Sequence, residues 1–122
     1  MQHTSRFLAL VESVKNQVNH ITQAELLALL NNKDLVIIDV REKEEFNRGH
    51  LPCAIHLSKG VLERDIEKII ANPETEIVVY CSGGYRSILA AYNLQQMGYT
   101  HIKSLIAGST AWQAQGLPMQ GN

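Results

Sequence analysis

Residues 77–87 carry the strongest structural signal of the chain, with the sequence Ile77-Val78-Val79-Tyr80-Cys81-Ser82-Gly83-Gly84-Tyr85-Arg86-Ser87. The first four residues are too few for a helix, and their unbroken apolar run is typical of a strand that is buried on both faces. Two consecutive glycines then permit a sharp turn of the backbone. These features predict a strand over 77–80, a loop that begins at Cys81, and a helix over 87–97.

The same alternation of strand and helix signals extends from this segment in both directions. Residues 35–38 form a second aliphatic run, which ends at Asp39 and also predicts a buried strand. Weaker strand candidates lie at 54–57 and 101–105, and further helices are expected over 42–48, 61–71 and 109–115. This alternation predicts a doubly wound α/β fold, with a mostly parallel sheet and helices on both faces. In such a fold, ligands bind beyond the carboxyl ends of the strands.

Two more helices are predicted before the first of these strands. Apolar residues recur at helical spacing between Phe7 and Val18, which indicates an amphipathic helix of about four turns. Thr22, followed three residues later by Glu25, has the pattern of a capping box and begins a second helix directly after the first. We expect the first helix to pack on the rest of the protein, and a dimer or partner contact is the alternative.

The composition is that of one ordinary globular domain, with 122 residues, 45% hydrophobic and 19% charged. The chain has eleven basic and twelve acidic side chains, so no broad positive field would attract nucleic acid or an anionic membrane. Neither a signal-peptide core nor a membrane span is predicted, and we expect a cytoplasmic protein. The expected organisation is a helical extension over 1–19, a domain over 20–118 and a tail over 119–122.

The cysteines point to thiol chemistry more than to structure. Cys53 and Cys81 are too few for a disulfide framework, and neither they nor the histidines have the spacing of metal ligands. We therefore expect no metal. Cys81 follows a buried strand, and the N–H groups of the glycine turn and the next helix favour a thiolate there. Arg86 adds a fork of donors suited to an oxyanion such as a sulfonate. The alternative is that Cys81 is a small buried apolar residue, as most free cysteines are.

Residues 81–87 resemble the active-site loop of the rhodanese family, Cys-x-x-Gly-x-Arg-Ser. The resemblance covers roughly residues 20–118 and includes two further signatures. The first consists of Asp39-Val40-Arg41, Glu44-Glu45-Phe46 and Gly49-His50-Leu51-Pro52. The second consists of Gly108 to Trp112 and Gly116-Leu117-Pro118. This resemblance implies a doubly wound α/β domain in which Cys81 is the nucleophile and cycles between thiolate and persulfide. The backbone of Ser82, Gly83, Gly84, Tyr85 and Arg86 would then form the cradle for the transferred sulfur and its donor.

The resemblance implies a sulfurtransferase that needs no cofactor. Its donor would be a small molecule such as thiosulfate, and its acceptor would be cyanide, a small thiol or a protein thiol. Two alternatives stay open: a binding module that carries persulfide for a protein partner, and a phosphatase or arsenate reductase of the same fold. The loops of that last class contain one more residue between cysteine and arginine than the four found here.

Three positions depart from the family pattern. Cys53 and Ala107 stand where the family usually has glycine, and Tyr85 replaces a small or polar residue, which would narrow the entrance or offer an aromatic surface. We interpret Cys53 as a small packed residue, with a resolving thiol as the alternative.

Asp39, Arg41 and Ser87 are interpreted as supporting residues. We expect Asp39 to cap the turn after its strand and Arg41 to pair with Glu44 or Glu45, with a catalytic role for Asp39 and Arg41 as the alternative.

Overall fold

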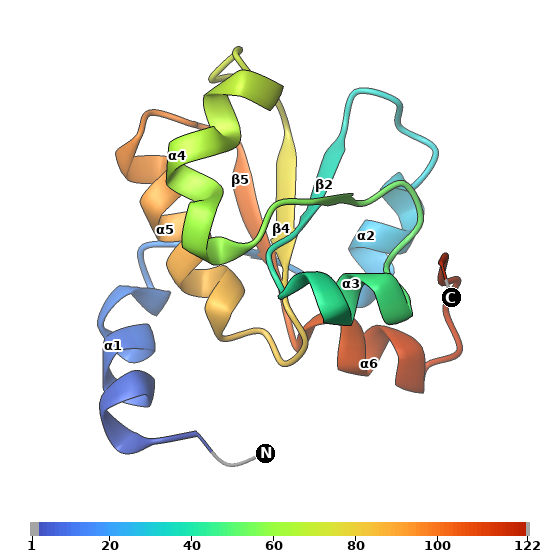
Figure 1. Ribbon diagram of the computed structural model, residues 1–122, viewed down its shortest axis with the longest axis horizontal. Coiled ribbons are helices and arrows are strands. Elements are labelled where there is room, and N and C mark those ends of the chain that lie inside the picture. The colour runs from blue at the N-terminus through green and yellow to red at the C-terminus, as the bar shows by residue number, and fades with distance from the viewer. Residues whose placement is uncertain (1–2, 122) are drawn as a thin grey trace.

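Five parallel strands form one sheet at the centre of the computed structural model, which describes residues 3–121. The strands are β1 (Asn19–Ile21), β2 (Val36–Asp39), β3 (Ile55–His56), β4 (Ile77–Tyr80) and β5 (Ile102–Leu105). Their order in the sheet is β1-β5-β4-β2-β3, so β4 lies in the middle (Figure 1). The residue that follows β4 therefore emerges at the centre of the carboxyl edge of the sheet.

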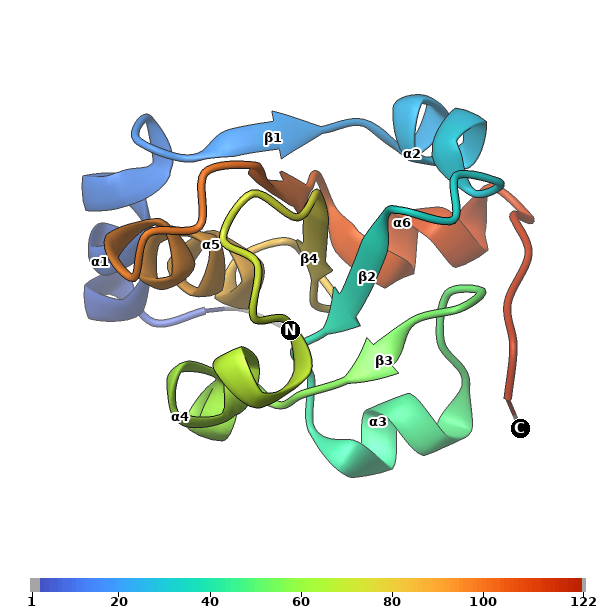
Figure 2. The same cartoon turned by 90° about the horizontal axis from the view of Figure 1, so that it is seen from above.

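Helices cover both faces of the sheet. They are α1 (Ser5–Lys15), α2 (Gln23–Leu29), α3 (Lys43–Arg48), α4 (Lys59–Ile69), α5 (Arg86–Gln96) and α6 (Gly108–Ala114). One apolar cluster joins α1, α4 and α5 to one face, and a second joins α2 and α6 to the other (Figure 2). These layers confirm the predicted α/β fold.

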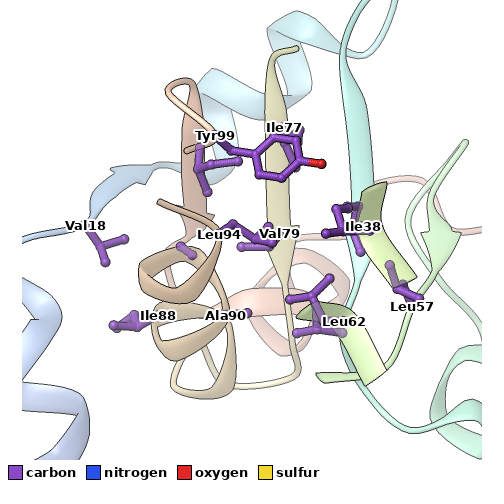
Figure 3. Close-up of a cluster of buried hydrophobic side chains, with 14 of the residues drawn as sticks. Val18, Ile38, Leu57, Leu62, Ile77, Val79, Ile88, Ala90, Leu94 and Tyr99 are labelled. Carbon is purple, nitrogen blue, oxygen red and sulfur yellow. The ribbon is translucent and has the colours of Figure 1, made fainter. Parts of the chain in front are cut away.

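The strands alternate their side chains between the two clusters. Ile77 and Val79 face α4 and α5, whereas Val78 and Tyr80 face α2 and α6. Figure 3 shows the first cluster, in which Leu94 of α5 packs beside Val79. Full burial of one such side chain contributes about 1.5–3 kcal/mol to stability. A strand that is covered on both faces gains this contribution from every side chain, and a continuous apolar run therefore predicts a central strand.

The N-terminal region differs from the prediction. The first helix ends at Lys15 and does not continue to Val18, and the second helix does not follow it directly, because β1 lies between them and pairs with β5 at the edge of the sheet. The physical reason is that Val18 and Ile21, both buried, also fit the helical spacing of the apolar residues before them. The capping box of Thr22 and Glu25 is present as predicted.

The C-terminal tail is tied to the domain at Gln120, which forms an antiparallel bridge with His50. Asn122, the last residue of the predicted tail, lies outside the described residues. Within residues 3–121, no helix has the length and apolar character needed to cross a bilayer.

Candidate active site

Cys81 lies at the carboxyl end of β4, where the chain turns into α5. Its sulfur accepts hydrogen bonds from the backbone N–H groups of Gly84, at 3.2 Å, and Ser87, at 3.4 Å. Gly84 has φ +92°, and a Cβ atom there would lie 2.8 Å from the backbone nitrogen of Ala107, so only glycine fits this turn. The loop thus curls around the sulfur with its donors turned inward, an arrangement that stabilises negative charge on sulfur.

Two buried hydroxyl groups lie behind the sulfur. The Cys81 sulfur is 3.6 Å from Oγ of Ser87, which in turn is 2.8 Å from Oγ of Ser104 on β5. Both serines are buried, so these contacts take the place of hydrogen bonds to water. Sequence reasoning missed Ser104, although a serine that shares a strand with apolar buried residues, here Ile102 and Leu105, is a usable signal.

Arg86 is paired with Glu45 of α3. Its two terminal nitrogens donate to the two carboxylate oxygens at 3.1 and 3.3 Å, and one of them also donates to Oγ of Ser82 at 2.7 Å. The hydrogen bonds that Arg86 donates to Glu45 raise the pKa of Arg86, against the opposing effect of burial. Burial alone would raise the pKa of Glu45, but the hydrogen bonds from Arg86 and the Glu42 backbone outweigh it and lower that pKa. Sequence reasoning named Glu45 within a family signature and as a partner for Arg41, and did not pair it with Arg86.

That expected pairing of Arg41 with Glu44 or Glu45 is wrong. Arg41 instead binds Asp39, with Nε at 3.0 Å from both carboxylate oxygens and a terminal nitrogen at 2.7 Å from one of them. Asp39 is fully buried at the end of β2, and a buried carboxylate requires a charged partner within reach. The expected turn is present, because Oδ1 of Asp39 accepts the Arg41 backbone N–H at 2.9 Å.

Tyr80 completes this buried network, since its hydroxyl donates to Asp39 at 2.7 Å. Burial and the charge on Asp39 raise the pKa of Tyr80 far above its ordinary value. Because the network joins β2 to the last residue of β4, it fixes the strand end from which Cys81 emerges.

Cys53 and Ala107 both adopt left-handed backbone conformations, with φ of 62° and 60°. An L-residue there costs about 1–2 kcal/mol, whereas glycine does not, which explains why the family usually has glycine at both positions. Cys53 is exposed, so its interpretation as a packed residue is wrong: the left-handed turn directs its side chain to solvent.

The turn between β5 and α6 supports the loop around Cys81 through backbone hydrogen bonds. The backbone N–H groups of Ser109 and Thr110 donate to the carbonyl oxygens of Cys81, at 2.9 Å, and Ser82, at 3.0 Å. A Cβ atom at Gly108 would overlap both carbonyl groups, so the close approach requires glycine.

Cys81 lines a groove with a volume of about 1150 Å³. The other lining residues come from the N-terminal segment, the loop, α3 and the α6 region: His3, Thr4, Phe7, Glu45, Ser82, Gly83, Tyr85, Arg86, Ala107, Thr110, Ala111 and Ala114. Cys53 lies elsewhere. The contribution of His3 and Phe7 was missed, because sequence reasoning could not place the first helix relative to the loop. In the described part of the chain, no three His, Cys, Asp or Glu side chains cluster as metal ligands.

Comparison with known proteins identifies the family. The sequence model of the rhodanese-like domain matches residues 22–115. Thiosulfate sulfurtransferase GlpE of Coxiella burnetii is 35% identical over 98 residues, which cover 80% of this chain and 87% of that protein.

Two solved structures match nearly the whole chain. The polysulfide-sulfur transferase homodimer of Wolinella succinogenes has 30% sequence identity and a TM-score of 0.81, with 97% of this chain and 89% of that chain covered. A protein of unknown function from Rhodopseudomonas palustris, described as a possible tyrosine phosphatase, has 31% identity and a TM-score of 0.84, with 98% of each chain covered. The named sulfurtransferases support sulfur transfer as the class of activity. The chain belongs to the family of rhodanese-like domains.

Proposed function

We propose that the protein is a sulfurtransferase in which Cys81 takes sulfane sulfur from a donor such as thiosulfate, holds it as a persulfide, and passes it to a thiol or cyanide. The observation that carries this proposal is that the sulfur of Cys81 accepts hydrogen bonds from two backbone N–H groups and that Cys81 lines the groove. These donors suit both an attacking thiolate and a bound persulfide, because each carries negative charge on sulfur.

In the first half-reaction, the Cys81 thiolate attacks the outer sulfur of thiosulfate. A sulfur–sulfur bond forms to Cys81, the sulfur–sulfur bond of thiosulfate breaks, and sulfite leaves with the electron pair. The outer sulfur then bears the negative charge, within reach of the N–H groups of the loop. Arg86 would stabilise the sulfonate end of the donor, although its pairing with Glu45 means that the anion must compete with a carboxylate.

In the second half-reaction, the acceptor attacks the outer sulfur of the persulfide. A bond forms between the acceptor and that sulfur, and the Cys81 thiolate leaves with the electron pair. The N–H groups of Gly84 and Ser87 receive this thiolate, which restores the starting state. The acceptor is a small thiol, cyanide or a cysteine of a partner protein.

A phosphatase is the second candidate, because one structural relative is described as a possible tyrosine phosphatase. The loop argues for sulfur transfer instead. Four residues separate Cys81 from Arg86, and this short arc converges on one sulfur and leaves little room for a tetrahedral phosphoryl group.

The deciding experiment compares thiocyanate formation from thiosulfate and cyanide with hydrolysis of an aryl phosphate. We expect the first reaction to proceed and to be lost in Cys81→Ser, with the second at background. Phosphatase activity that depends on Cys81, without thiocyanate formation, would overturn the proposal. Single-turnover sulfur loading without steady-state turnover would instead identify a persulfide carrier that needs a protein acceptor.

A further inference from the structure

Gln23 is a buried residue at the start of α2 and does not line the groove. Its place follows from the sheet, because β1 ends two residues earlier and its last residue, Ile21, pairs with Leu105 at the end of β5. The segments after β1 and β5 therefore leave the sheet side by side, and α2 and α6 cover the same face (Figure 2). Glutamine is usually exposed, so a buried glutamine needs polar partners.

The side-chain amide of Gln23 holds the turn between β5 and α6. Its Nε2 atom donates to the carbonyl oxygen of Ile106 at 2.6 Å and to that of Gly108 at 3.3 Å. Two carbonyl acceptors require the NH₂ end of the amide, which fixes the orientation of the side chain. The turn needs this support, because Ala107 and Gly108 adopt consecutive left-handed conformations, with φ of 60° and 56°, and alanine is strained there.

The turn passes this restraint to the loop around Cys81. The carbonyl group of Gly108 and the N–H group of Ser109 belong to one peptide group, and that N–H donates to the carbonyl oxygen of Cys81 at 2.9 Å. Gln23 and Cys81 are thus the two ends of a chain of hydrogen bonds that runs through one peptide group. In such a chain, each hydrogen bond polarises and strengthens the next.

These contacts set the planes of two peptide groups in the loop. The carbonyl oxygen of Ser82 accepts the N–H group of Thr110 at 3.0 Å, just as that of Cys81 accepts the preceding N–H group of the turn. A trans peptide is planar, with its C=O and N–H on opposite sides. The N–H groups of Ser82 and Gly83, which belong to these two peptide groups, therefore point away from the turn.

Sulfur transfer requires donors for two different sulfur atoms. Before the reaction, the sulfur of Cys81 accepts the N–H groups of Gly84 and Ser87. In the persulfide, the negative charge lies on the outer sulfur, one bond farther from these two donors. Ser82 and Gly83 both line the groove, so their N–H groups are the next donors that the loop offers.

We propose that Gln23 is a positioning residue for sulfur transfer, which acts through the β5–α6 turn to orient the N–H groups of Ser82 and Gly83 toward the outer sulfur of the persulfide. This inference rests on the proposed function, and the bonds that form and break are those of its two half-reactions. Loss of the Gln23 amide should slow persulfide formation. It should affect the reactivity of the Cys81 thiolate much less, because the donors to that thiolate belong to other peptide groups.

The first test compares Gln23→Met with the wild type. Methionine has a similar length but cannot donate to the turn. Since Oε1 of Gln23 is buried without a partner within residues 3–121, its removal offsets part of the loss of the two hydrogen bonds. Single-turnover loading of Cys81 is measured over a range of thiosulfate concentrations. We expect the rate constant at saturation to fall about 3- to 10-fold, the effect of about one hydrogen bond. The half-saturating concentration and the rate of alkylation by iodoacetamide should stay within about twofold of the wild type.

Gln113→Met is the matched control, because Gln113 is an exposed glutamine of α6 that lies outside the groove. It should leave the rates of loading and alkylation unchanged. Gln23→Glu is a second variant, which keeps the size of the side chain but replaces the amide donor with a carboxylate acceptor. It should slow loading at least as much as Gln23→Met. Urea unfolding gives the folded fraction of each variant, and the rates are referred to that fraction.

The second test uses the wild type alone. Sulfur loading of the ¹⁵N-labelled protein should move the amide proton signals of Ser82 and Gly83 downfield, because their N–H groups gain a charged acceptor. If these signals do not move, or if both folded Gln23 variants load sulfur as fast as the wild type, the positioning role is overturned and the proposed function stays intact. Equal slowing of loading and alkylation would also overturn it, since Gln23 would then act on the thiolate. Failure of the wild type to load Cys81 from any sulfane donor would instead count against the proposed function.

Discussion

Arg86 donates hydrogen bonds to both carboxylate oxygens of Glu45, at 3.1 and 3.3 Å, although 41 positions separate the two residues in the sequence. The pair joins the end of the loop around Cys81 to helix α3. It also means that the cation of the loop faces a competing carboxylate whenever an anionic donor arrives.

Glu45→Gln should therefore lower the KM for thiosulfate about 3- to 10-fold, because it removes the competing charge beside Arg86. Arg86→Ala should act in the opposite direction and raise KM. The measurement is steady-state thiocyanate formation at low and high salt, with the larger effect at low salt. Glu44→Gln removes the same charge from an exposed neighbour in α3 and serves as the control. A KM that rises in Glu45→Gln would mean that the carboxylate holds Arg86 in its working position.

The Glu45–Arg86 pair should also give the stability a defined pH dependence. The pKa of Glu45 is lowered from 4.5 in the folded protein, so its contribution is fully present above that value and is lost as pH falls through the lower folded pKa. At pH 7, the free energy of unfolding of the wild type should exceed that of Glu45→Gln by about 0.5–1 kcal/mol. The difference is small because the side chains of Glu45 and Arg86 are both partly exposed. Urea unfolding at pH 7 and at successively lower pH below 4.5 measures the difference, which should shrink with acidification. A constant difference would contradict the pairing.

Ser104 should act on Cys81 through Ser87, because their hydroxyl groups are 2.8 Å apart and Ser87 lies next to the sulfur. We expect Ser104→Ala to slow alkylation of Cys81 at neutral pH about two- to tenfold, the worth of one ordinary hydrogen bond. In a Ser87→Ala background, the same change should have no further effect. If Ser104→Ala slows alkylation of Cys81 equally in the wild type and in the Ser87→Ala variant, Ser104 does not act through Ser87.

Cys53 offers a test of backbone strain that leaves the site untouched. Cys53→Gly should relieve about 1–2 kcal/mol of left-handed strain and lose about 0.5–1 kcal/mol through the greater freedom of glycine in the unfolded chain, for a net gain near 0.5–1 kcal/mol. Cys53→Ala removes the thiol but keeps the strain, and it should be close to wild type. Denaturant unfolding gives both values. A loss of stability in Cys53→Gly would contradict the strain argument.

The central part of the fold was predictable because its signals are local. Residues 77–80 are a strand as predicted, because an aliphatic run this short is typical of a strand buried on both faces. Thr22 caps its helix through contacts with Glu25, three residues away. The edge strand β1 was not predictable in the same way. It has three residues, and its pairing with β5 depends on a segment more than eighty positions further along the chain.

The same difference between local and distant contacts applies to the candidate site. The donors around Cys81 lie within six residues of it, so the loop sequence was sufficient to propose them. The partner of Arg41 was misjudged because four carboxylates lie close in sequence and only the buried one, Asp39, requires the charge. The contributions of Ser104 and Phe7 depend on how distant elements pack, which composition and periodicity do not specify.

The most direct test of the account is mass spectrometry of the intact protein and of its Cys81 peptide after incubation with thiosulfate. We predict that the peptide gains the mass of one sulfur atom, that cyanide removes this sulfur as thiocyanate, and that Cys81→Ser abolishes the gain. Cys53→Ser should load sulfur as wild type does, because Cys53 lies outside the groove. A folded protein whose Cys81 gains no sulfur from any sulfane donor, or gains it only when Cys53 is present, would contradict the proposal.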